Sequence, residues 1–364
     1  MSTVTAAPPT AHSVRLVAER EIGSKLRSKA FVISSIILFA VALAGIIWGG
    51  FAASSSGGTP VAVVGEAAQD VPADAGLEVT EVTDRAAAEA LVTSGDVDAA
   101  VVPDASSPLG FRVIADTSVP TQLIMTLAQT PPVELLNPDG DAGFLGYIAA
   151  VGFGAVFLAA ASMFGGTIAQ SVVEEKQTRV VELLISTIPA RALLAGKVIG
   201  NTILAMAQIL ILAAIAIVGL AVTGQTELLQ GIGTPIVWFA VFFLFGFILL
   251  ASLFAAAAAM VSRQEDIGST TTPLTLLVMA PYILVIIFFD NPLVLGVMSY
   301  IPFSAPVGMP MRMFLGEAQW WEPLLSLVIL IATCVAAILV GARIYENSLL
   351  RMGARVKLAD ALTR

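Results

Sequence analysis

The chain has 364 residues, of which 57% are hydrophobic and only 12% are charged, and its formal net charge is −9 at pH 7. Soluble domains usually carry about 25% charged residues, so this composition excludes an ordinary soluble protein and indicates a polytopic α-helical membrane protein. The single cysteine, Cys334, excludes an intramolecular disulfide, and the single histidine, His12, cannot by itself build a metal or catalytic cluster.

The first 29 residues combine a polar tail with a helical pattern. Val14, Ala18, Ile22 and Leu26 recur every four residues, which predicts an amphipathic elbow helix on the inner leaflet. The uncharged run 30–51 is long enough to cross about 30 Å of hydrocarbon and predicts the first membrane span. A secretory signal peptide is the alternative, but its apolar core is usually only about 7–15 residues long.

Residues 52–144 form a different kind of segment, in which Pro, Gly and Asp are frequent and acidic residues dominate. Runs at 60–64, 76–82, 98–102 and 111–115 predict short strands. Asp84 predicts a capped helix over 85–93, and 117–128 predicts a second helix. We therefore expect a small extracytoplasmic α/β domain inserted between the first and second spans. The segment contains no phosphate loop, zinc spacing or serine elbow, so nothing in it indicates an enzyme.

The next two spans, predicted at 145–169 and 198–222, flank a charged loop at 172–197. Val173, Val180, Val181 and Leu184 lie at helical spacing, which predicts a single short amphipathic helix from Val173 to Thr187. Pro189 ends that helix because proline has no N–H and clashes with the preceding turn. Within it, Glu175 and Arg179 are placed to form an i,i+4 ion pair.

Three further spans are predicted at 236–261, 272–289 and 324–342, for a total of six, followed by a basic tail at 343–364. A short charged turn with Arg263, Gln264 and Glu265 separates the fourth and fifth spans. The segment 291–313 is apolar but broken by Pro302, Pro306 and Pro310, which favours short re-entrant helices over another span.

Two amides, Asn201 and Gln208, lie seven residues apart in the third span. Buried amides in hydrocarbon usually face a partner helix or a wet path. Contact between helices is the first interpretation. The alternative is a translocation path, formed by these two residues together with Pro302, Phe303 and Pro306.

The distribution of basic residues predicts the topology. With both termini in the cytoplasm, the cytoplasmic segments hold fifteen of the 18 lysines and arginines, and the opposite side holds Arg85, Arg112 and Arg312. Since cytoplasmic loops are enriched in Lys and Arg, the segment 52–144 is expected outside the cell.

Several segments, in this order and spacing, resemble the type-2 ABC exporter permeases, in particular their sodium-efflux and antibiotic-efflux branch. In the charged loop, the resemblance rests on Glu174-Glu175-Lys176, Glu182-Leu183-Leu184, Ser186-Thr187, Pro189 and Gly196-Lys197. Later in the chain it rests on Met260-Val261-Ser262, Gln264-Glu265, Thr271-Thr272-Pro273-Leu274, the run 300–306 and Ala342-Arg343-Ile344-Tyr345. Nearly the whole chain is covered.

This resemblance implies a permease subunit that is not itself an enzyme and binds no cofactor or metal. ATP and Mg²⁺ would belong to a separate cytoplasmic ABC ATPase, and a second permease, either a copy or a paralogue, would complete the assembly in a bacterial plasma membrane. The cargo would be Na⁺ or an amphipathic drug or lipid. The residues expected to couple to the ATPase are Glu174, Glu175, Lys176, Arg179, Glu182, Leu183, Leu184, Ser186, Thr187, Pro189 and Lys197, together with the turn at Arg263, Gln264 and Glu265.

Three other interpretations remain open. The charged loop is equally typical of a solvated interfacial helix. An ion-coupled secondary transporter would need ionisable residues near the bilayer midplane, for which Asp290 is the only candidate. The chain could also be a membrane-anchored sensor or assembly protein with a ligand-binding outer domain.

Overall fold

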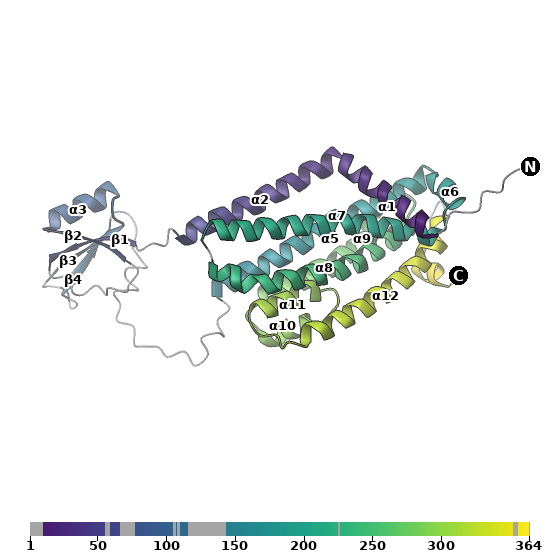
Figure 1. Ribbon diagram of the computed structural model, residues 1–364. Coiled ribbons are helices and arrows are strands. Elements are labelled where there is room, and N and C mark those ends of the chain that lie inside the picture. Colours follow the sequence, from purple (N-terminus) through teal and green to yellow (C-terminus); the bar gives the residue numbers. More distant parts are fainter. Residues whose placement is uncertain are drawn as a thin grey trace, which may run out of the picture. The chain divides into compact units, whose positions relative to one another are not determined.

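The computed structural model describes residues 10–54, 59–65, 77–104, 107, 110–115, 143–224, 226–351 and 356–363. It divides into two compact units, one made of Met1–Ala44 with Asn137–Arg364 and the other of Gly45–Leu136. The first is a bundle of long helices and the second is built on a β-sheet (Figure 1). The predicted helix at 117–128 lies outside the described residues.

The predicted six membrane spans are confirmed in number and order. The helices α2 (Lys29–Ser54), α5 (Gly143–Gln177), α7 (Ala190–Val222), α8 (Thr226–Ala259), α9 (Ile267–Ile287) and α12 (Glu322–Leu349) supply them. Each contains a stretch long and apolar enough to cross a bilayer. At 1.5 Å per residue, the 35 residues of α5 extend about 50 Å, which exceeds the hydrocarbon thickness. This helix therefore continues past the membrane into the charged loop.

The other helical elements of this unit are shorter than the spans. They are α1 (Thr10–Arg27), α6 (Val180–Ile185), a 3₁₀ turn (Gln264–Asp266), α10 (Pro292–Met298), α11 (Ala305–Phe314) and α13 (Leu358–Leu362). The helices α10 and α11 match the prediction of short helices at 291–313. Pro302 lies in the turn between them and Pro306 in the first turn of α11, where no N–H is needed, whereas Pro310 is inside α11.

Aromatic side chains of α8 hold the bundle together. Phe243 packs edge-on against Phe157 of α5, with ring centroids 5.9 Å apart, and Phe247 packs similarly against Phe164 at 5.6 Å. All four side chains are buried. The outward residues of α2, among them Ile33, Ile36 and Val41, are exposed and suit contact with lipid.

The second unit contains a four-stranded sheet in the order β2-β1-β3-β4. β1 (Thr59–Val64) is parallel to β2 (Leu77–Val82) and to β3 (Ala99–Pro103), while β4 (Phe111–Ile114) is antiparallel to β3. One helix, α3 (Arg85–Ser94), follows β2, and Asp84 caps it by accepting from the Ala87 N–H at 2.8 Å. The four predicted strands and this capped helix are therefore confirmed.

Two predictions about the ends of the bundle are corrected. α1 turns Val17, Ala18 and Glu21 inward, so its buried face carries a carboxylate, whereas the predicted ridge residue Leu26 is exposed. The chain after Ala342 is not a separate tail, because α12 continues to Leu349. Beyond α12 the Val356 N–H donates to the Met260 carbonyl at 2.9 Å, and this bond returns the chain to the end of α8.

Candidate functional site

The charged loop is built differently from the single helix predicted over Val173–Thr187. α5 continues to Gln177, and the chain then changes direction at Arg179. The φ of 58° and ψ of 11° of this residue place it in the left-handed region. The Thr178 hydroxyl donates back to the Glu174 carbonyl at 2.8 Å. The predicted helix is therefore wrong. Two helices, α5 and α6, meet at a kink that the left-handed residue creates.

The short helix α6 presents a mixed surface to the outside. Val181 is buried and Leu184 half-buried, and both pack against the bundle core. On the other side Leu183 is 73% exposed and Val180 37% exposed. The apolar inner side of α6 thus anchors it, while its outward side carries Glu182 together with the exposed apolar residues Leu183 and Val180.

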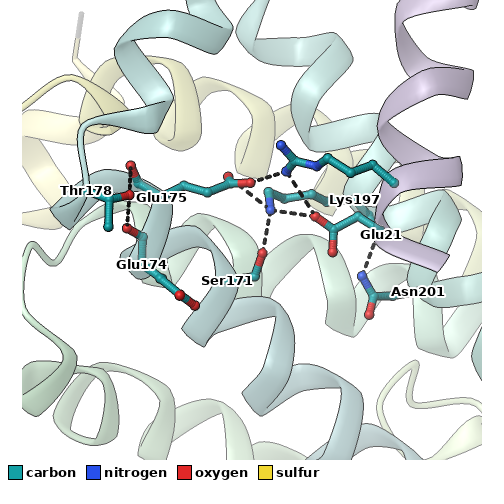
Figure 2. Close-up of polar contacts among 8 residues, drawn as sticks. Glu21, Ser171, Glu174, Glu175, Thr178, Lys197 and Asn201 are labelled. Atoms are coloured by element: carbon teal, nitrogen blue, oxygen red, sulfur yellow. Dashed lines mark hydrogen bonds and ion pairs between the residues drawn. The ribbon is translucent and has the colours of Figure 1, made fainter. Parts of the chain in front are cut away.

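Beneath this loop, α1, α5 and α7 share a buried network of charged side chains (Figure 2). The Lys197 Nζ lies 2.8 Å from Glu21 Oε1 and 3.0 Å from Glu175 Oε2, and it donates to the Ser171 hydroxyl at 2.6 Å. Arg20 in turn pairs with Glu175 and lies 3.4 Å from Glu21. The Lys197 side chain is only 1% exposed. Two cations and two carboxylates balance in charge, and Arg20 is the partly exposed member, with 42% of its side chain exposed.

Electrostatics keep the α1 members of this network charged. Burial tends to raise the pKa of Glu21, but Lys197 and Arg20 outweigh it and lower that pKa overall. Burial also tends to lower the pKa of Arg20, yet Glu175 and Glu21 raise it overall. Both side chains are therefore ionised at neutral pH.

Lys176 occupies a second buried position, with no exposed surface. Its Nζ donates to the Ala259 carbonyl at 2.8 Å and to the Ser348 carbonyl at 3.0 Å. These carbonyls belong to the last turns of α8 and α12, where the negative ends of the helix dipoles favour a cation. Lys176 thus ties the ends of two span helices to the end of α5.

The structure separates the predicted coupling residues into two groups. The exposed ones are Glu174, Arg179, Glu182, Leu183, Ser186, Thr187 and Pro189, and Leu184 is half-buried. Glu175, Lys176 and Lys197 instead point into the bundle, which corrects their prediction as direct contact residues. The predicted Glu175–Arg179 pair is not formed either, because Arg20 and Lys197 take the Glu175 carboxylate.

The predicted second turn is exposed. Arg263, Gln264 and Glu265 all face outward, and Arg263 pairs with Glu265 at 3.2 Å. These two side chains are 71% and 72% exposed, so the pair contributes little to stability. The turn is therefore available to a partner.

The residues predicted for a translocation path have separate surroundings. The Asn201 amide donates to the Lys197 carbonyl at 2.9 Å, so Asn201 lies beside the charge network. Gln208 is buried further along α7. Pro306 packs closely on Gly246 of α8, while Pro302 and Phe303 are half-buried.

Sequence reasoning missed Arg20, Glu21 and Ser171. A signal for Glu21 did exist, because this carboxylate lies next to Ala18 and Ile22 on the apolar side of the predicted helix. A charge on an apolar helix face indicates a buried partner. Nothing in the local pattern identified that partner as Lys197, 176 residues away.

A further buried ion pair joins α11 to α12. The Arg312 guanidinium bonds both carboxylate oxygens of Glu322 at 3.1 Å, and the Tyr300 hydroxyl donates to the same carboxylate at 2.8 Å. This pair fixes the turn between the two helices. Among the described residues, no group of three or more His, Cys, Asp or Glu side chains is placed to hold a metal ion.

Comparison with known proteins supplies the family. Residues 106–343 match the model of the ABC-2 family transporter protein. The chain belongs to the ABC-2 transporter family. The predicted resemblance to type-2 ABC permeases is thereby confirmed at the level of the family.

Two curated relatives of this ABC-2 family member are uncharacterized. It is 30% identical over 203 residues to the uncharacterized protein YhaP of Bacillus subtilis, which covers 52% of this chain and 48% of that protein. It is 25% identical over 209 residues to the uncharacterized protein MJ1024 of Methanocaldococcus jannaschii, which covers 57% of this chain and 51% of that protein. The chain thus spans about half the length of the curated relatives it matches, and no solved structure matches it.

Proposed function

We propose that this ABC-2 family chain is the membrane subunit of an ABC exporter that couples to a separate cytoplasmic ATPase through α6. Both termini, α6 and the turn at Arg263–Glu265 then lie in the cytoplasm of a bacterial cell, and the sheet unit lies outside. The basic-residue distribution supports this orientation.

The observation that carries the proposal is the surface of α6. Leu183 is 73% exposed, and the same loop carries the exposed side chains of Glu182 and Glu174. An exposed apolar side chain with charged neighbours suits a protein interface, where the leucine is buried on contact and the charges orient the partner. The kink at Arg179 holds this helix away from the axis of α5.

The work of transport would be divided between subunits. The ATPase binds ATP and Mg²⁺, and its movement shifts α6 and with it the span helices. Two permeases, either two copies of this chain or a copy and a paralogue, pair with two ATPases. The cargo is Na⁺ or an amphipathic drug or lipid, and the low number of charged residues in the spans favours the amphipathic cargo.

Co-purification with candidate ATPases tests this proposal. We expect the full chain to bind an ATPase and to raise its ATP turnover, and we expect Glu174→Arg/Glu182→Arg to lose both effects. A matched control is Glu78→Arg/Glu81→Arg, which makes the same charge change at two exposed positions of β2. The proposal fails if no ATPase binds the wild-type chain, or if the control pair disrupts binding as strongly as the α6 pair.

A further inference from the structure

The α1 helix packs closely on α7 at Gly196 and Gly200, and this contact is called the α1 seat. A Cβ atom added at Gly196 would lie 2.5 Å from the Val17 Cβ and 2.8 Å from the Val14 carbonyl oxygen. One added at Gly200 would lie 2.9 Å from the Ala18 carbonyl oxygen and 3.0 Å from the Glu21 Cβ. Two glycines four residues apart on one helix face therefore let α1 approach α7 at backbone distance.

Ion pairs also hold α1 at this seat, and together they are called the charge lock. Lys197 follows Gly196 directly and pairs with Glu21 of the seated helix at 2.8 Å (Figure 2). The same Nζ lies 3.0 Å from Glu175, near the end of α5, and Arg20 of α1 pairs with Glu175 as well. Glu175 is thus held by one cation from α1 and one from α7. Without α1, it would lose the cation that Arg20 supplies.

The position of Glu175 connects this lock to α6. Arg179, where the chain kinks into α6, lies only four positions after Glu175. Successive backbone bonds bridge this interval, from the Thr178 N–H to Glu174 and from the Arg179 N–H to Lys176, and the Glu182 N–H then bonds to Arg179. These bonds overlap along residues 174–182, so Glu175 lies in the same hydrogen-bonded stretch as the start of α6.

We propose that α1 is a positioning element for α6, seated by Gly196 and Gly200 and locked by Glu21 and Arg20 onto Lys197 and Glu175. When α1 is seated, the end of α5 is fixed and α6 stands in one orientation. When α1 is released, the end of α5 loosens and the loop 174–187 opens locally. The consequence for ATP turnover rests on the proposed function, whereas the control of the loop by α1 does not.

Hydrogen exchange on the full chain in lipid nanodiscs tests this inference, with Glu21→Gln and Arg20→Gln as the variants. Glu21→Gln keeps the size of the side chain, and Arg20→Gln shortens a side chain that is 42% exposed, so the fold of the span helices is preserved. Amide exchange reports local opening, and loss of one partner of a buried ion pair is strongly destabilising. We expect exchange to be at least about tenfold faster over α1 and over residues 174–187 in each variant. Where an ATPase binds, we expect permease-dependent turnover to fall severalfold while co-purification is retained.

The matched control is Arg15→Gln/Glu19→Gln. This pair lies on the same helix at 2.7 Å but is exposed, so its loss should leave exchange and turnover at wild-type levels. The inference is overturned if α1 exchanges faster in Glu21→Gln while residues 174–187 do not, because α1 would then be an anchor only. It is also overturned if neither segment changes. If no ATPase binds the wild-type chain, the proposed function fails, and the exchange result still decides this inference.

Discussion

Lys197 and Glu21 are 176 positions apart in the chain, yet their side chains pair at 2.8 Å and are only 1% and 7% exposed. Replacing Lys197 with methionine keeps most of the side-chain volume but leaves Glu21 and Glu175 with Arg20 as their remaining cation. Removal of one partner from a buried ion pair typically costs about 3–5 kcal/mol. We therefore expect Lys197→Met to lower the thermal unfolding temperature of the purified protein clearly, as measured by differential scanning fluorimetry.

Lys357→Met is the matched control for this prediction. It makes the same replacement at an exposed lysine, where changes usually remain within about 0.5 kcal/mol. Equal unfolding temperatures for the two variants would show that the buried network contributes nothing measurable to stability.

Gly196 and Gly200 offer a second test, because their lack of a side chain is what admits α1. In Gly196→Ala the new methyl group would meet Val17 at 2.5 Å, so α1 must shift or detach. Overpacking of this kind typically costs about 1–3 kcal/mol. Gly166→Ala on α5 is the control, since a Cβ there meets nothing within 4 Å and alanine is the better helix former. We expect lower stability and faster proteolysis of α1 only in Gly196→Ala. Unchanged proteolysis in that variant would mean that α1 is not seated on these glycines.

The membrane spans could be predicted from the sequence because each depends on a local property, namely a long uncharged run. The strands at 59–64 and 99–103 were predictable for the same reason, since short apolar runs between turn residues mark them. The Asp84 cap is equally local.

The charged loop was predicted less well because its structure depends on one residue and on distant partners. Apolar spacing continues from Val173 to Leu184, so a single left-handed residue at Arg179 leaves no mark on the pattern. Glu175 and Lys176 follow an exposed Glu174, and the sequence pattern does not distinguish them from it. Their inward direction is decided by Lys197 of α7 and by the ends of α8 and α12. Glycine spacing at Gly196 and Gly200, combined with Glu21 on an apolar face, was the one available signal for the α1 seat.

The conformation of Arg179 leads to a third prediction. A non-glycine residue in the left-handed region costs about 1–2 kcal/mol, while glycine there loses extra entropy on folding. We therefore expect Arg179→Gly to leave stability unchanged or to raise it by up to about 1 kcal/mol. Arg179→Val should lower it, because a β-branched side chain is poorly tolerated at positive φ.

The control for this prediction is Glu182→Gly. It places a glycine three residues later, inside α6, where the cost relative to a good helix former is about 1 kcal/mol. Thermal unfolding of the three variants checks the order. If Arg179→Gly were the least stable of them, the left-handed kink would not be the state that the protein adopts.

The lowered pKa of Glu21 predicts how the seating of α1 depends on pH. Burial tends to raise this pKa, but Lys197 of α7 and Arg20 of α1 lower it overall. Glu175 of α5 shares the same two cations. The pKa of Lys25, also on α1, is lowered overall, because burial and Lys197 together outweigh Glu21. The ordinary pKa of glutamate is about 4.3. A carboxylate whose pKa is lower than this in the folded state stabilises the fold at every pH above the ordinary pKa. The stabilisation is lost as pH falls through the lower folded value.

We therefore expect α1 to stay seated from neutral pH down to about 4 and to loosen below it. Spin labels on Leu16→Cys of α1 and Ile199→Cys of α7, both exposed positions, would follow this in a Cys334→Ala background. Their distance distribution should be narrow at pH 7 and broad below pH 4. With Glu21→Gln added, the distribution should be broad at every pH, because the titrating group is absent. A broadening of the wild-type distribution between pH 5 and 8 would assign the transition to another group and would contradict the role of Glu21.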